Sequence, residues 1–217
     1  QHVGNREYTL YLPLYNTVKW MEINVPQESS FKPLPIHEDA PVVVYGTSIA
    51  QGACASRAGL AWTNILSRKL DRPVVNLGFS GNGRLEEPVI KLMTEINAKL
   101  FVLDCLPNMV PGIFTIAEIK KRITDAAKIL QAKQPHIPIL FCDHDGFTDE
   151  GINETSRKKY QEANIALKEV VDSLTAAGMK NIYHLSKDAI GQDIESMVDG
   201  VHPNDIGMMH YADAYEK

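Results

Sequence analysis

The sequence predicts a doubly wound α/β domain, in which helices cover both faces of a parallel β-sheet. Short apolar runs recur along the chain, and each ends at glycine or at polar residues. Between these runs, apolar residues return at the three- and four-residue spacing of a helix. The connections are short, and parallel strands that are neighbours in a sheet need a crossover between them. The alternation of the two patterns therefore predicts a series of strand–helix units.

The first 38 residues have a different pattern. Two runs rich in β-branched and aromatic side chains, residues 8–12 and 18–25, predict two short strands. Because two strands alone are marginally stable, we expect them to dock on the main body or to belong to the end of an N-terminal β-module. Residues 26–39 contain three prolines and scattered charges, which predict a linker. The predicted division is a β segment with its linker over residues 1–38 and one domain over 39–217.

From residue 41 onward, predicted strands and helices alternate. The first strand is a continuous apolar run that stops at Gly46, as expected of a strand buried on both faces. The five predicted strands are residues 41–45, 73–77, 99–103, 137–142 and 181–184. Helices are predicted where apolar residues follow helical spacing, over residues 62–70, 85–96, 116–130, 160–174 and from about Asn204 onward.

Composition and charge exclude several classes of protein. Hydrophobic residues make up 44% of the chain and charged residues 23%, which is typical of globular domains and not of disordered chains. The net charge is −5 and no run of basic residues occurs, so we expect no nucleic-acid partner. The apolar runs are far shorter than the roughly 20 residues that cross a bilayer, so no membrane span is predicted.

The cysteines and the first residue bear on the compartment. Cys54, Cys105 and Cys142 form no C-x-x-C pair, so neither a zinc knuckle nor a thioredoxin-like centre is predicted. The chain begins with Gln1, so we expect part of a longer precursor to precede it. This expectation favours an exported protein, periplasmic or extracellular. The sequence leaves the oligomeric state open.

Small and polar residues follow the predicted strands. In open α/β sheets, ligands bind beyond the carboxyl ends of the strands, so these residues define the expected site. They are residues 46–48, 78–83, 104–108 and 143–145, together with 199–203 in the C-terminal tail.

Ser48 is the candidate nucleophile at this edge. A serine hydroxyl is weak at neutral pH and needs a neighbouring base that a third group orients. His202 is the candidate base, and Asp199 would hold its tautomer, because Gly200 and Pro203 favour a loop in which the carboxylate turns back to the imidazole. Taken singly, Ser48 is more simply interpreted as a helix N-cap and Asp199 as a turn residue. Together at one edge, the three residues favour catalysis.

Acyl transfer also needs hydrogen-bond donors for the developing oxyanion. Gly81 offers a backbone N–H in a loop that permits close approach, and Asn108 offers a side-chain amide. The alternatives are a tight strand-to-helix turn at Gly81 and a turn residue at Asn108, and they stay open. Gly78 and Gly83 are predicted to be structural.

Other motifs do not match. Residues 46–50 miss the fifth position of the nucleophile elbow G-x-S-x-G, which disfavours the common α/β-hydrolase topology. Residues 46–52 lack the lysine of a phosphate-binding P-loop, and residues 78–83 lack the order of a dinucleotide fingerprint, so no cofactor is predicted. Asp143-His144-Asp145 form a weak candidate for a divalent cation, and polar residues that close a strand are the simpler interpretation.

Four blocks of these residues resemble the SGNH (GDSL-type) hydrolases. The blocks are Gly46-Thr47-Ser48, Ser80-Gly81-Asn82-Gly83, Pro107-Asn108 and Asp199-Gly200-Val201-His202-Pro203, in the order of the family. The resemblance implies a three-layer α/β/α sandwich of flavodoxin-like topology with a five-stranded parallel sheet. It also implies Ser48 as nucleophile, His202 as base and Asp199 as its support. The oxyanion hole would combine the backbone amides of Ser48 and Gly81 with the Asn108 side chain.

The sequence departs from the family pattern at two places. Thr47 replaces the aspartate of the GDS signature, and Cys105-Leu106-Pro107 replaces the usual glycine-rich lead into the third block. The sequence is more similar to the bacterial esterase branch, which has a small β-module before the hydrolase domain, than to the better-known lipase members of the family. That likeness implies metal-independent hydrolysis of a small acyl ester, an acetyl group on a carbohydrate being the expected substrate. The alternatives are a non-catalytic carbohydrate- or protein-binding module with the same fold and a metal-dependent hydrolase that uses Asp143, His144 and Asp145.

Overall fold

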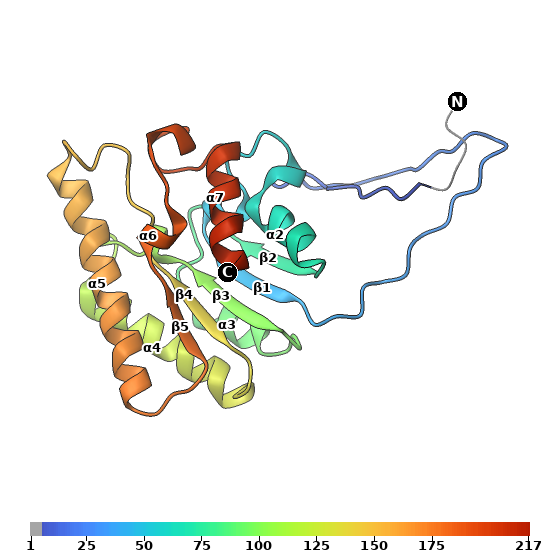
Figure 1. Ribbon diagram of the computed structural model, residues 1–217. Helices are drawn as coiled ribbons and strands as arrows, with labels where there is room; N and C mark the ends of the chain where they lie inside the picture. The colour runs from blue at the N-terminus through green and yellow to red at the C-terminus, as the bar shows by residue number, and fades with distance from the viewer. Residues whose placement is uncertain (1–5) are drawn as a thin grey trace.

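The computed structural model describes residues 6–217 and contains one parallel sheet of five strands. The strands are β1 Val42–Gly46, β2 Val74–Gly78, β3 Leu100–Asp104, β4 Ile139–Cys142 and β5 Ile182–Leu185. Their order across the sheet is β2-β1-β3-β4-β5, and every neighbouring pair is parallel (Figure 1). This arrangement confirms the predicted flavodoxin-like sheet.

Helices cover both faces of the sheet, which confirms the predicted α/β/α sandwich. Within residues 6–217 the helices are α1 Ser48–Gln51, α2 Trp62–Leu70, α3 Glu87–Met93, α4 Ile116–Lys133, α5 Glu154–Ala176, α6 Lys187–Ile190 and α7 Asp205–Glu216. Short 3₁₀ turns occur at Ala58–Leu60, Leu106–Asn108 and Ile194–Ser196. No helix in this part of the chain combines the length and the apolar character that crossing a membrane requires.

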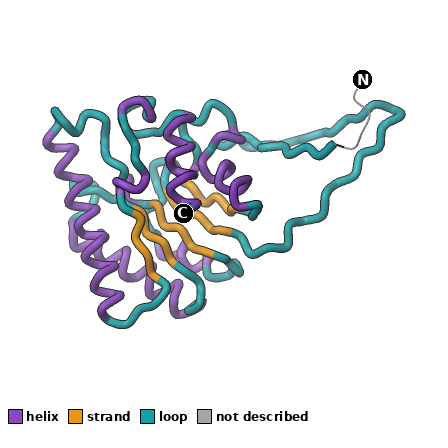
Figure 2. Tube along the Cα trace, viewed as in Figure 1, coloured by secondary structure: helices purple, strands orange, loops and turns teal. Residues whose placement is uncertain are grey.

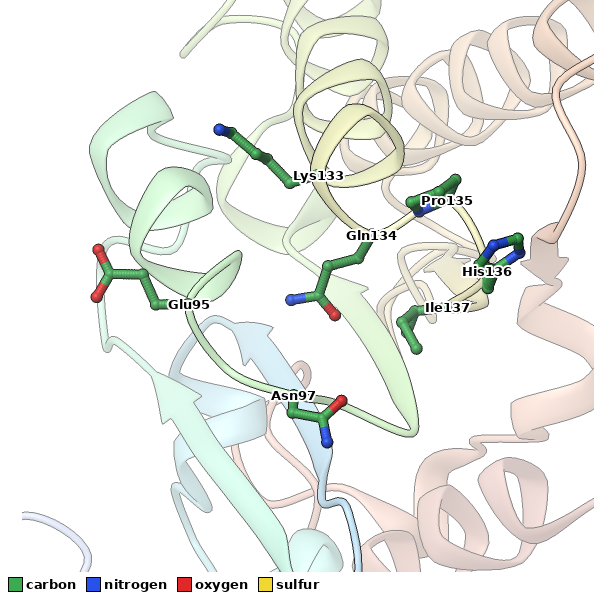
Figure 3. A pocket seen from close by; sticks show the side chains of 7 residues that line it. All are labelled: Glu95, Asn97, Lys133, Gln134, Pro135, His136 and Ile137. Carbon is green, nitrogen blue, oxygen red and sulfur yellow. The ribbon is translucent and has the colours of Figure 1, made fainter.

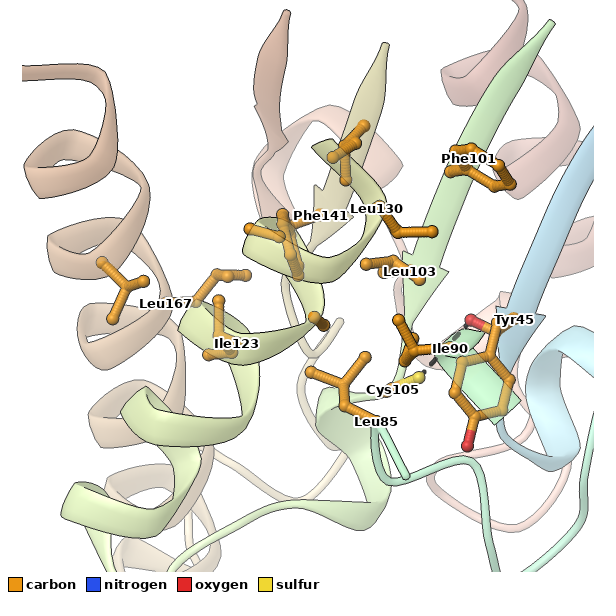
Figure 4. Close-up of a cluster of buried hydrophobic side chains, with 14 of the residues drawn as sticks. Tyr45, Leu85, Ile90, Phe101, Leu103, Cys105, Ile123, Leu130, Phe141 and Leu167 are labelled. Atoms are coloured by element: carbon orange, nitrogen blue, oxygen red, sulfur yellow. Dashed lines mark hydrogen bonds between the residues drawn. The ribbon is translucent and has the colours of Figure 1, made fainter. Parts of the chain in front are cut away.

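The sheet separates two hydrophobic clusters because successive strand side chains point to opposite faces. On one face Tyr45, Phe101 and Phe141 pack with α3, α4 and α5, as Figure 4 shows. On the other face α1, α2, α6 and α7 enclose Trp62, whose ring stacks on Tyr215 at 4.4 Å between ring centroids. Every residue of β1 is buried, as its unbroken apolar run predicts.

Side-chain caps fix where the long helices begin. Thr115 accepts a hydrogen bond from the Glu118 amide before α4, and Asn153 accepts one from the Ser156 amide before α5. Asn204 caps α7, where the last helix is expected to begin. The helix predicted over residues 85–96 is shorter in the structure. The four-residue helices α1 and α6 were not predicted, because a single turn carries no apolar periodicity.

The N-terminal region differs from the prediction. No strand forms within residues 6–41, and the two strands expected at residues 8–12 and 18–25 are extended chain that reaches away from the sheet (Figures 1 and 2). The backbone groups of a strand need a neighbouring strand, and here the sheet ends at β2 without pairing to this segment. Large apolar side chains along it are exposed, with Trp20 at 77%.

The N-terminal segment does touch the domain near α1 and α2. Gln51 Nε2 donates to the Leu14 carbonyl at 3.0 Å. Arg68 donates to the Tyr11 hydroxyl at 2.9 Å and lies over the same ring. These contacts attach the segment beside the helix that begins at Ser48.

Candidate active site

Ser48 lies at a tight turn between β1 and α1. A side chain at Gly46 would place its Cβ 2.6 Å from Ala50 Cβ and 2.7 Å from the Asp104 carbonyl, so only glycine fits at this point. The next residue, Thr47, is fully buried and its hydroxyl accepts from the Ile49 amide at 3.3 Å. Thr47 therefore caps α1, a role that a short polar side chain can fill without being aspartate. The turn holds Ser48 at the carboxyl edge of the sheet.

Ser48, His202 and Asp199 form one hydrogen-bonded chain. Ser48 Oγ lies 2.8 Å from His202 Nε2, and His202 Nδ1 lies 2.7 Å from Asp199 Oδ2. A carboxylate only accepts hydrogen bonds, so the imidazole proton is on Nδ1 and Nε2 is left to accept from the serine hydroxyl. The structure thus brings together three side chains that the sequence separates by up to 154 positions.

The loop around Gly200 fixes the carboxylate of Asp199. Gly200 has a positive φ of 92°, and Asp199 Oδ1 accepts from the amides of Val201 at 3.2 Å and His202 at 2.8 Å. Partial burial by itself would raise the pKa of Asp199, but the hydrogen bonds from His202 and Val201 outweigh it and lower that pKa. The carboxylate is therefore ionised at neutral pH and can stabilise a protonated imidazole.

The loops after β2 and β3 meet the Ser48 turn. Phe79 N donates to the Gly46 carbonyl at 2.9 Å, and a Cβ at Gly83 would lie 2.0 Å from the same oxygen. Asn108 Nδ2 donates to the Asn82 carbonyl, which uses one of its two N–H groups. Gly81 has a positive φ of 70° and open space beside it.

Two backbone donors at this edge are uncommitted. Within residues 6–217, the amides of Ser48 and Gly81 donate no hydrogen bond to another backbone or side-chain group. The second N–H of Asn108 comes from the adjoining loop. The arrangement provides donors of the kind that a developing oxyanion needs.

Asp143, His144 and Asp145 do not converge on a common point. Asp143 accepts from His184 Nε2 at 2.7 Å and from the Lys187 amide at 3.0 Å. His144 Nδ1 accepts from a backbone amide two residues later, and all three side chains are buried. The two contacts of Asp143 join the end of β4 to β5 and to the start of α6, which favours the structural interpretation of this tripeptide.

Cys54 lies beside the triad formed by Ser48, His202 and Asp199, a proximity that the sequence did not predict. Its Sγ is within 4.8 Å of a carboxylate oxygen of Asp199 and a ring nitrogen of His202. Partial burial, with a smaller contribution from Asp199, raises the pKa of the Cys54 thiol, so the thiol is not an activated nucleophile at neutral pH. The only signal in the sequence was the position of Cys54, six residues after Ser48 in the same connection.

A cavity of about 360 Å³ lies away from the triad. Its lining residues, labelled in Figure 3, come from the end of α4 and from the connections that lead into β3 and β4. These connections enter the amino ends of the strands, whereas Ser48 follows the carboxyl end of β1. Gln134 closes part of it by donating to the carbonyls of Thr94 and Ile96. None of its lining residues is hydrogen-bonded to Ser48, His202 or Asp199.

The sequence as a whole was compared with known families. Residues 39–217 match the model of the GDSL-like lipase/acylhydrolase family. The chain belongs to the GDSL-like lipase/acylhydrolase family. A second model, described as the N-terminus of SGNH-hydrolase-type esterases, matches residues 1–31 of the same chain. No curated protein matches the sequence.

Solved structures share the fold of this GDSL-like chain. A protein described as a GDSL-like lipase from Bacteroides ovatus ATCC 8483 is 36% identical, with a TM-score of 0.74 over 82% of this chain and 51% of that one. A salicylyl-acyltransferase from a tetracycline biosynthetic pathway is 18% identical, with a TM-score of 0.69 over 82% and 53%. A family two carbohydrate esterase from Clostridium thermocellum is 13% identical, with a TM-score of 0.67 over 85% and 65%. The chain spans about half the length of the first two, and the last two likenesses show the fold alone.

Proposed function

We propose that this GDSL-like chain is a serine esterase that hydrolyses a small acyl ester through an acyl-enzyme on Ser48. The observation that carries the proposal is the hydrogen-bonded chain from Ser48 through His202 to Asp199 at the carboxyl edge of the sheet. A serine in ordinary surroundings has no base aligned on its hydroxyl. Here the base has its accepting nitrogen 2.8 Å from the serine oxygen and a carboxylate on its other nitrogen.

The reaction would proceed in two displacements. Ser48 Oγ attacks the ester carbonyl while His202 Nε2 takes the hydroxyl proton, and Asp199 stabilises the imidazolium. The amides of Ser48 and Gly81 and the Asn108 side chain would hold the oxyanion. His202 then gives its proton to the leaving alcohol. A water molecule repeats the attack on the acyl-enzyme with His202 again as base, and releases the acid.

We propose an acetyl group on a carbohydrate as the substrate. The carbohydrate esterase with the same fold was solved in complex with cellohexaose, which supports a saccharide as the alcohol part. Phe79, 43% exposed on the loop that carries Gly81, offers an apolar face beside the proposed oxyanion hole. Half of the Asp199 side chain is exposed, so water reaches the triad, and this supports hydrolysis over transfer to a second alcohol.

We also propose a division of labour along the chain. Residues 39–217 would form the catalytic domain, and residues 1–38 a segment and linker that belong to an N-terminal β-module. The separate family models over the two parts and the exposed apolar side chains of the N-terminal segment support this division.

Labelling of Ser48 tests the function directly. A fluorophosphonate reacts only with an activated serine, so we expect the intact mass of the wild type to rise by one adduct and that of Ser48→Ala to stay unchanged. An unlabelled wild type would point to a binding module that kept the fold. A series of acetylated sugars against esters of longer acyl chains then tests the substrate. Faster turnover of the longer chains would contradict the acetyl assignment.

The oxyanion role of Asn108 gives a separate prediction. Removing one preorganised donor costs about 10²–10³ in kcat, so Asn108→Ala is expected to lower kcat by that factor with little change in KM. Asn82→Ala is the matched control, because Asn82 contributes its backbone carbonyl to this contact and its side chain is exposed. Steady-state kinetics on one acetyl ester provide the measurement. Equal losses in the two variants would contradict the assignment.

A further inference from the structure

Three side chains with different metal-binding atoms meet beside Ser48. Cys54 Sγ, one carboxylate oxygen of Asp199 and one ring nitrogen of His202 all lie within 4.8 Å of one another. Within residues 6–217, this is the one place where three or more His, Cys, Asp or Glu side chains come this close. Cys54 is exposed, and the side chains of Asp199 and His202 are 49% and 26% exposed, so solvent reaches the cluster.

The spacing is near that of a zinc site. Zinc binds sulfur at about 2.3 Å and nitrogen or oxygen at about 2.0–2.2 Å, so the ligand atoms of a tetrahedral site stand roughly 3.5 Å apart. Each of the three separations is at most 4.8 Å, so none has to shorten by more than about 1.3 Å to reach that value. His202 Nδ1 and Asp199 Oδ2 are already 2.7 Å apart and would separate slightly to take the ion between them. A thiolate, a carboxylate and a neutral imidazole together balance the two positive charges of the ion. Water can take the fourth position on the exposed side.

We propose that Cys54, Asp199 and His202 form an inhibitory zinc site. Binding releases the thiol proton of Cys54 to solvent, and its sulfur coordinates as the thiolate. A thiolate favours zinc over magnesium or calcium, which prefer oxygen ligands. Asp199 and His202 thereby exchange their mutual hydrogen bond for bonds to the ion.

Zinc at this position would disable the base, a consequence that rests on the proposed function. If zinc takes Nδ1, the remaining ring proton is on Nε2, which then donates to Ser48 and can no longer accept its proton. If zinc takes Nε2, the accepting atom itself is occupied. In both cases Asp199 no longer orients the ring.

Zinc binding is measured first, independently of catalysis. Titration of wild type and Ser48→Ala with zinc chloride is expected to show one ion per chain in both proteins. Disturbing an outer-shell partner of a metal ligand lowers metal affinity roughly 10–100-fold, and loss of a direct ligand lowers it further. Cys54→Ser is therefore expected to bind zinc at least about 100-fold more weakly than the wild type. Cys54→Gly is a second variant that suits the positive φ of 67° at this residue.

A second histidine–carboxylate pair provides the control. His37 and Asp39 lie 3.4 Å apart on exposed chain, so His37→Ala tests for binding elsewhere and is expected to leave the affinity unchanged. Undiminished binding in both Cys54 variants would mean an adventitious ion only and would overturn the proposal.

Inhibition is measured on ester hydrolysis. Zinc is expected to abolish turnover by the wild type, a chelator to restore it, and magnesium to have no effect. Cys54→Ser should keep the basal rate and resist zinc. Binding that depends on Cys54 without inhibition would overturn the inhibitory role. If the wild type hydrolyses no ester and takes no fluorophosphonate, the proposed function fails, while the titrations still decide the metal site.

Discussion

Ser48→Ala is expected to lower kcat/KM for a short-chain acetyl ester by about 10⁴-fold or more, to near the rate left by the oxyanion donors and binding alone. The loss is large because the variant removes the atom that forms the acyl-enzyme, and His202 then has no hydroxyl to activate. By the same reasoning, His202→Ala should lose about as much. The variant that carries both substitutions should have a kcat/KM only slightly lower than that of either single variant, because the two residues act as a unit.

The matched control for Ser48 is Ser80→Ala. Ser80 lies exposed on the loop after β2, at the same edge of the sheet, and its backbone amide rather than its hydroxyl binds Gln51. This control is expected to keep the wild-type rate. Urea unfolding curves would establish that each variant is folded. A Ser48→Ala protein that hydrolyses the ester as fast as the wild type would remove Ser48 from the mechanism.

The sheet and the edge at which the candidate site lies were predictable from the sequence for one shared reason. Strands buried on both faces are continuous apolar runs, so the strand predicted over residues 41–45 matches β1 to within one residue without any partner being known. Once the strands are parallel, their carboxyl ends must lie at one edge, and the residues after them must be neighbours. That topological rule places Ser48 near the residues that follow β2 and β3. His202 follows no strand directly, because α6 and a 3₁₀ turn separate it from β5, so its 2.8 Å contact with Ser48 across 154 positions needed the structure.

The N-terminal strands and Cys54 were not predictable because each depends on contacts outside its own segment. Residues 8–12 and 18–25 have the side chains of strands, but a strand needs a partner, and β2 ends the sheet without pairing to them. The approach of Cys54 to Asp199 depends on how the connection between α1 and α2 packs on the C-terminal loop. Thr47, by contrast, makes its contact within its own segment. It caps α1, and this role explains why a residue other than aspartate can stand at this position of the family pattern.

The burial of Asp104 was also invisible in the sequence, which placed it among polar residues at the site edge. Asp104 ends β3 opposite Gly46 of β1 and is fully buried. Burial, and next the nearby Asp145 carboxylate, raise the pKa of Asp104 to about 7, and the Tyr215 hydroxyl offsets only part of this. The domain therefore carries a carboxyl group that is protonated when folded at pH values where an unfolded chain would have lost the proton.

Asp104→Asn is expected to make the free energy of unfolding less dependent on pH. Between the ordinary pKa of 3.8 and about 7, the unfolded wild type loses the Asp104 proton while the folded protein keeps it. The contribution of this group to stability is thus fully present below the unfolded pKa and falls as pH rises toward the folded one. From pH 5 to pH 8 the fall is on the order of 2–3 kcal/mol, which asparagine, having no titrating proton, should not show. Groups that do not interact with Asp104 titrate equally in both proteins, so the difference between the two curves reports Asp104 together with its coupling to its buried neighbours.

Urea unfolding of both proteins at pH 5, 6, 7 and 8 measures this difference. The matched control is Asp71→Asn, an exposed carboxylate at the end of α2 whose positive φ of 45° asparagine also tolerates. The free energy of unfolding of the control should follow the wild-type curve at every pH. That of Asp104→Asn should increase relative to the wild type as pH rises. Parallel curves for wild type and Asp104→Asn would show that Asp104 does not hold a proton in the folded state. A rise in the stability of Asp104→Asn relative to the wild type would show that Asp104 holds a proton in the folded protein. The wild-type domain would then lose stability toward alkaline pH because of this one buried acid at the end of β3.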